Sequence, residues 1–73
     1  MRNEIMERQL REQMKICDRP SLSDEAALAR LRHYKRRLIR LRVSGSSGDS
    51  DYFRNCCVMH EVYRRIAERR GLI

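Results

Sequence analysis

The stretch Ser44-Gly45-Ser46-Ser47-Gly48 decides the fold, because the residues on both sides of it favour helix and it does not. Short Gly/Ser segments behave as flexible coil, and they offer no side chain that anchors in a core. The flanking segments, by contrast, are rich in helix-forming residues and carry apolar residues at helical spacing. The stretch therefore predicts a flexible linker over residues 44–48, between one segment at 1–43 and another at 49–73.

The segment 1–43 predicts two helices, over about residues 3–17 and 24–42. Pro20 ends the first helix, since the residue before a proline is pushed out of the α region. Ser23 is placed to cap the second helix, and Asp24 and Glu25 put negative charge at the positive end of its dipole. A gap of about five residues is typical of helices that run antiparallel. We therefore expect a helical hairpin over this segment.

The segment 49–73 predicts one partner helix, over about residues 51–70. Asp49 and Asp51 supply a second N-terminal cap, and Gly71 is well placed to end the helix. Arginines gather in its last turns, as the helix dipole prefers. The sequence thus predicts an all-α fold, a small antiparallel three-helix bundle in which a Gly/Ser linker joins a helical hairpin to a third helix.

The composition of the linker favours an engineered joint between interacting helical segments of two proteins. It contains no proline, asparagine or charged residue, and the capping pattern restarts completely at Asp49. A natural surface loop is the alternative, since Gly and Ser are ordinary loop residues. In a fusion, the core between the segments is also their binding interface, and the apolar stripes predict its residues: Met6, Leu10, Met14, Leu28, Leu31, Tyr34, Leu38, Leu41, Tyr52, Phe53, Cys56, Met59, Val62, Tyr63 and Ile66.

The positive charge is concentrated in residues 24–43, which carry seven basic and two acidic side chains, net +5 of the chain's +7. Such a segment favours an acidic partner, either nucleic acid or an acidic protein surface. A solvated polar face, with arginine stems covering the rim of the core, is the alternative. The candidate contact residues are Arg32, Lys35, Arg36, Arg37, Arg40 and Arg42.

Cys57 and His60 are the residues that come nearest to a chemical site. They lie three positions apart, and Cys56 lies four positions before His60. Either cysteine–histidine pair could ligate zinc from one helix face, with Cys17 or His33 completing the site. Two closely spaced ligand pairs would be persuasive, and here there is barely one. No third group is implied that would orient a thiol–imidazole pair for catalysis. We therefore expect no metal, no cofactor and no enzymatic activity.

These patterns together predict a protein–protein interaction module whose two segments bind each other. The charge pattern and the odd number of cysteines favour an intracellular scaffold or regulatory complex, with the nucleus as a candidate location. No apolar run approaches the ~20 residues that span a membrane, so no membrane partner is expected. Further oligomerisation stays open. The alternative function is a natural basic helical domain that binds nucleic acid through residues 30–42.

Overall fold

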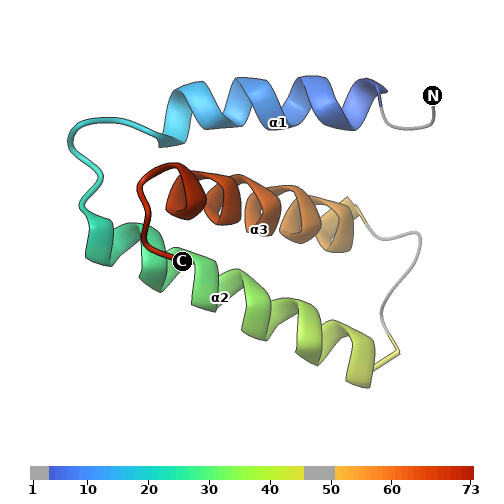
Figure 1. Ribbon diagram of the computed structural model, residues 1–73. Coiled ribbons are helices and arrows are strands. Elements are labelled where there is room, and N and C mark those ends of the chain that lie inside the picture. The colour runs from blue at the N-terminus through green and yellow to red at the C-terminus, as the bar shows by residue number, and fades with distance from the viewer. Residues whose placement is uncertain (1–3, 46–50) are drawn as a thin grey trace.

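The computed structural model describes residues 4–45 and 51–73, and within these ranges the backbone forms three helices. They are α1 (Glu4–Cys17), α2 (Asp24–Val43) and α3 (Asp51–Arg69), each within one residue of the predicted bounds. Consecutive helices run in opposite directions (Figure 1). The predicted all-α fold, a small helical bundle, is confirmed. Most of the predicted linker, residues 46–48, lies outside the described residues, as does Asp49.

Helix α2 begins at the residue that the sequence indicates. The Ser23 side-chain oxygen accepts a hydrogen bond from the backbone N–H of Ala26 at 3.0 Å, and the backbone at Ser23 is extended. This bond satisfies one of the N–H groups that a helix start leaves without a partner. Leu22, just before the cap, is half-buried against the core. The cap and the packing of Leu22 thereby hold the connection between α1 and α2 in place where it enters α2.

Helix α3 ends in a turn that requires glycine. Gly71 has a φ of 72°, in the left-handed region that other residues avoid. Its N–H donates to the carbonyl of Glu68 at 3.1 Å, and the N–H of Leu72 donates to the carbonyl of Ala67 at 2.8 Å. This is the Schellman arrangement expected of a C-terminal glycine. It turns the chain end back toward the first turns of α2 (Figure 1).

Helix α3 lies between the other two helices and packs against both (Figure 1). Among the described residues, no Cα atom of α1 comes within 8 Å of a Cα atom of α2. The structure thus differs from a hairpin that packs on itself and then receives a third helix. The apolar stripes of α1 and α2 both face α3, and the connection over residues 18–23 is long enough, at up to about 20 Å, to hold α1 and α2 apart.

The core is formed mainly by α3. Of the eight fully buried apolar side chains in the described ranges, α1 supplies Leu10, α2 supplies Ala27 and α3 supplies the other six. Those six are Cys56, Val58, Val62, Tyr63, Ile66 and Ala67. Half-buried side chains from all three helices and the connecting loop surround them. The hydrophobic core is therefore the contact between the two predicted segments. No helix in the described ranges has the length and apolarity to span a membrane.

The stability should depend far more on Ile66 than on Ile39, although both are isoleucines within helices. Ile66 has no exposed surface, whereas Ile39 is 52% exposed. We expect Ile66→Ala to lower the free energy of unfolding by about 2–5 kcal/mol through lost burial and a new cavity. The control Ile39→Ala should change it by about 0.5 kcal/mol or less. Urea unfolding followed by circular dichroism measures both, and equal changes would contradict this packing.

Candidate functional site

The predicted interface residues fall into three groups by burial. Leu10, Cys56, Val62, Tyr63 and Ile66 are fully buried. The others, except Tyr52, are half-buried, and the structure packs five of them directly against the core: Met6, Met14, Leu31, Tyr34 and Met59. Leu28, Leu38, Leu41 and Phe53 are half-buried outside that set. The structure thus brings most of the predicted residues together around α3.

Tyr63 is the centre of the contact between α2 and α3. Its ring stacks on that of Tyr34 with a centroid distance of 6.0 Å and an interplanar angle of 9°. Arg30 donates a hydrogen bond from Nη1 to the Tyr63 hydroxyl at 3.0 Å, and its guanidinium carbon lies 5.8 Å from the ring centroid. This hydrogen bond raises the pKa of Arg30, and burial raises the pKa of Tyr63. A buried aromatic ring with a satisfied hydroxyl is typical of an interface anchor.

Tyr52 is placed differently from the sequence expectation. Helical spacing puts it on the core stripe, yet it is 47% exposed. Its hydroxyl accepts a hydrogen bond from Nη1 of Arg37 at 2.7 Å, and the Arg37 guanidinium lies 5.9 Å from its ring centroid. The reason is its place in the first turn of α3, where α2 and α3 diverge (Figure 1). Tyr52 therefore makes a polar surface contact in place of a buried anchor.

Arg70 is an interface residue that sequence analysis missed. Its Nη1 donates to the carbonyl of Leu22 at 2.7 Å and to Oδ1 of Asp24 at 3.1 Å. Its Nη2 donates to Oδ1 of Asp18 at 2.9 Å and to the carbonyl of Arg19 at 3.3 Å. The hydrogen bond with Asp18 is the main cause of a raised Arg70 pKa. One guanidinium thus ties the end of α3 to the loop between α1 and α2.

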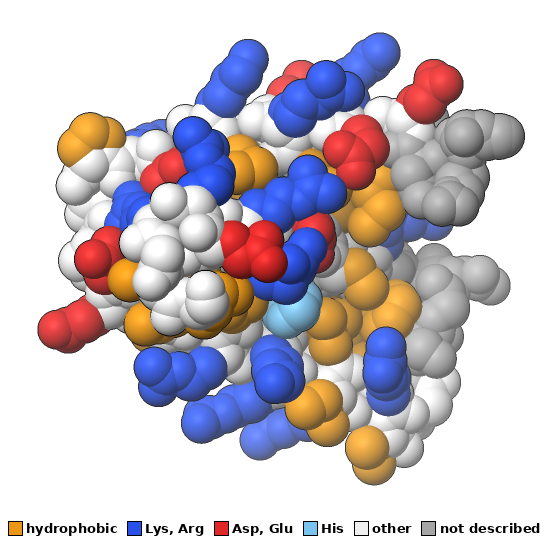
Figure 2. Space-filling model, in the orientation of Figure 1, with side chains coloured by type: hydrophobic (Ala, Val, Ile, Leu, Met, Phe, Trp, Pro, Cys, Tyr) orange, Lys and Arg blue, Asp and Glu red, His pale blue; other side chains and the backbone are white. Residues whose placement is uncertain are grey.

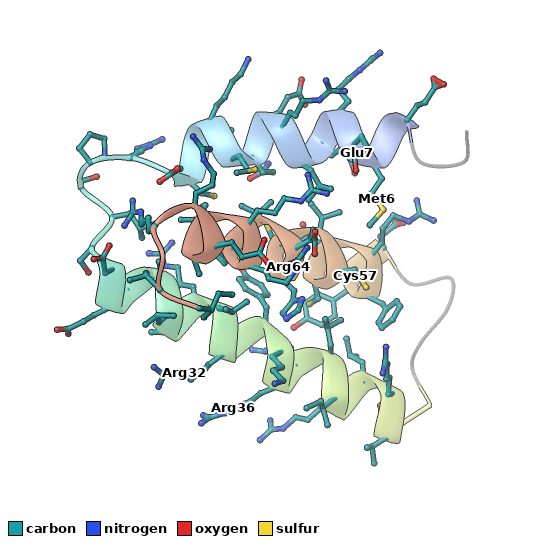
Figure 3. The ribbon with its side chains drawn as sticks, in the orientation of Figure 1. Met6, Glu7, Arg32, Arg36, Cys57 and Arg64 are labelled. Carbon is teal, nitrogen blue, oxygen red and sulfur yellow. The ribbon has the colours of Figure 1, made fainter. Side chains whose placement is uncertain are left out.

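Glu61 is the centre of an ion-pair network on the opposite side of α3. It pairs with Arg64 and Arg65, and Arg65 also reaches Oε1 of Glu7 on α1 at 3.3 Å. Figure 3 shows Arg64 and Glu7 on neighbouring helices at this surface. Hydrogen bonds from Arg64 first and Arg65 second lower the pKa of Glu61 to about 2, against the opposing effect of burial. Glu61 therefore stays ionised at neutral pH.

The six predicted acidic-partner contacts all lie on α2 and are all exposed. Arg32, Arg36, Arg37 and Arg40 line one shallow hollow on its outer side, together with Ala29 and His33. Lys35 and Arg42 lie apart from them, near enough to α3 for their charges to act on His60 and Cys57 respectively, although burial is the main cause of the lowered His60 pKa and of the raised Cys57 pKa. Figure 2 shows Lys and Arg gathered over α2 beyond its first turn, whereas acidic and basic side chains alternate over α1 and α3.

The cysteines and histidines show little reactive chemistry. Cys17, Cys56 and Cys57 are free thiols. Burial raises the pKa of Cys57 and lowers that of His60, so the neutral forms of both groups are favoured over a thiolate–imidazolium pair. Within the part of the chain that the structure describes, no group of three or more His, Cys, Asp or Glu side chains is placed to hold a metal ion.

Comparison with protein-family models, with curated protein sequences and with solved structures finds no match to this chain. The geometry described above is therefore the basis for assigning a function. Two features stand out in it, namely the interface around α3 and the arginine-rich outer side of α2. The first holds the bundle together. In the second, Arg37 hydrogen-bonds the Tyr52 hydroxyl of α3, whereas Arg32, Arg36 and Arg40 make no ion pair within the described residues.

Replacing Arg70 should weaken the bundle more than replacing its neighbour Arg69. The Arg70 side chain is 21% exposed and bonds three groups of the loop and the carboxylate of Asp24, whereas Arg69 is 66% exposed and makes one longer ion pair, 3.6 Å from Asp18. We expect Arg70→Gln to lower the melting temperature by several degrees and Arg69→Gln to leave it nearly unchanged. Similar losses in the two variants would show that general charge, and not this contact, matters.

The Glu61 network should make the bundle sensitive to acid. A carboxyl group whose pKa is lowered on folding stabilises the folded state above its unfolded pKa, and this contribution is lost as the pH falls through the folded pKa. For Glu61, the stabilising contribution is lost over the pH range between its ordinary pKa of 4.5 and its pKa in the folded chain of about 2. We expect Glu61→Gln to flatten the decline in melting temperature between these values. Glu12→Gln, on an exposed part of α1, should retain the full decline.

Proposed function

We propose that this chain is a protein–protein interaction module in which the segment 1–43 binds the helix of the segment 49–73. The main observation behind this proposal is that α3 supplies six of the eight buried side chains in the described ranges. Within the same ranges, α1 and α2 both pack against α3 and not against each other. Without α3, Leu10 and Ala27 would lose their main apolar partners. Binding is therefore coupled to folding, because the receiving helices gain their core only when the third helix is present.

Three polar contacts support a single orientation and register of the bound helix. Arg70 donates a hydrogen bond to Asp18 in the loop between α1 and α2, and Arg65 forms an ion pair with Glu7 on α1. The Tyr63 hydroxyl accepts a hydrogen bond from Arg30 on α2. These contacts lie at different positions along the axis of α3, and together they involve both α1 and α2. A helix that slid by one turn would move about 5.4 Å and break all three. The apolar side chains supply most of the affinity, and these contacts supply specificity.

The Gly/Ser composition of residues 44–48 supports the proposal that the two segments come from different proteins and were joined by an engineered linker. A short tether gives its ends an effective concentration of about millimolar, which holds even a weak pair together. The three free thiols fit partners from an intracellular scaffold or regulatory complex, and the basic α2 fits a nuclear one.

Separating the segments tests this function directly. We expect peptides covering residues 1–43 and 49–73 to be largely unfolded alone and to gain helicity on mixing, since short isolated helices are marginal in water. Circular dichroism and titration calorimetry measure the helicity and the affinity. An Ile66→Glu version of the second peptide is the control and should not bind. A segment 1–43 that unfolds cooperatively without its partner would contradict the proposal, as would failure of the peptides to associate.

A further inference from the structure

The outer side of α2 carries a surface that the interface does not use. We call it the basic face and define it by Arg32, Arg36 and Arg40, which repeat every four residues along the helix. All three are exposed, and Arg32 and Arg36 point away from the bundle (Figure 3). Because α2 packs against α3 alone, its opposite side remains open to solvent. The stems of these arginines therefore do not cover the rim of the core.

The charges of the basic face have no counter-charge within the described part of the chain. Residues 26–43 contain no Asp or Glu. The ion pairs of the described residues all use arginines of α3 and its end, namely Arg64, Arg65, Arg69 and Arg70. Like charges four residues apart on a helix repel each other. The folded chain thus tolerates this repulsion without compensation, which is expected when the compensating charge belongs to a bound partner.

We propose that the basic face binds the phosphate backbone of duplex DNA, with α2 lying along the major groove. Successive arginines of the face are about 6 Å apart along the helix axis, so the three extend over about 12 Å. Duplex DNA presents about one negative charge per 1.7 Å of its axis, and its major groove is about 12 Å wide and admits an α-helix. Guanidinium groups bind phosphate oxygens in pairs of hydrogen bonds.

Four other acidic partners fit the basic face less well. A single strand binds by stacking its bases on exposed rings, but the ring of Tyr34 stacks on that of Tyr63, and the half-exposed ring of Tyr52 is in contact with the Arg37 guanidinium. A protein partner requires apolar anchors at the centre of its contact. The hollow between the arginines holds only Ala29 and His33 besides them, and the exposed apolar Ile39 and Val43 line a second hollow toward the C-terminal end of α2, to one side of the face. A membrane-bound helix requires a free apolar side, whereas the apolar stripe of α2 faces α3. The major groove of duplex RNA is too narrow for side chains to enter.

The test measures binding of the whole chain to a labelled 20-base-pair DNA duplex by fluorescence anisotropy between 50 and 200 mM salt. We expect the logarithm of the binding constant to fall linearly with the logarithm of salt concentration, by about 0.9 per phosphate contacted. The triple variant R32Q/R36Q/R40Q should bind at least tenfold more weakly and with a shallower slope. Its melting temperature should not fall, because these side chains make no contact with the core.

A matched triple variant on α1, R8Q/R11Q/K15Q, removes the same charge from three exposed positions of another helix. It should keep the affinity within about twofold of the unchanged chain, since phosphate contacts act over about a Debye length of 10 Å. An equal loss in both variants would overturn the proposal in favour of a net-charge effect. Equal binding to polyglutamate, to duplex RNA or to anionic vesicles would also overturn it, as would the absence of salt-dependent DNA binding. Because the chain stays intact, none of these outcomes bears on association of the two segments.

Discussion

The burial of one face of α3 between two helices that do not pack on each other is the constraint on which the rest of the structure depends. Ile66, Val62 and Ala67 retain no exposed surface, although α3 is flanked by only two helices. Burying a large aliphatic side chain contributes about 1.5–3 kcal/mol, so a few residues of α3 supply most of the favourable free energy. A chain of this size has little folding free energy to spare. The helices on either side are consequently parts of one cooperative unit.

Apolar burial alone would leave the position of α3 along its groove poorly defined, because hydrophobic contacts have no direction. The polar contacts at its edges remove this ambiguity. Arg70 requires two carbonyl groups and two carboxylates in one arrangement, which the loop before α2 and the first residue of α2 provide together. The hydroxyl of the buried Tyr63 accepts a hydrogen bond from Arg30 and also interacts with the side chain of Cys17. A displaced helix would leave these groups without partners, and each such loss is unfavourable in a buried setting.

Local patterns were sufficient to predict the helices and their ends. Ser23 and Gly71 act through backbone groups within a few residues of themselves, so the sequence nearby contains all that is needed. The position of α3 between α1 and α2 was not predictable in this way, because periodicity gives the apolar face of a helix but not its neighbour. Tyr52 shows the same limit, since divergence of α2 from α3 exposes a residue on the correct face. The partners of Arg70 lie about fifty residues away in the chain, beyond any local pattern.

The distribution of acidic side chains connects the interface to the basic face. Asp18, Asp24 and Glu7 pair with arginines of α3 or its end, which connects the two segments. Glu61 pairs with Arg64 and Arg65 within α3. Among the described residues, no ion pair engages an arginine of α2. Salt distinguishes the two kinds of contact, because it weakens interactions between exposed charges strongly and contacts between buried apolar side chains hardly at all. A rise in ionic strength would therefore release a polyanion from α2 while the core around α3 stays intact, which makes the two proposed activities physically independent.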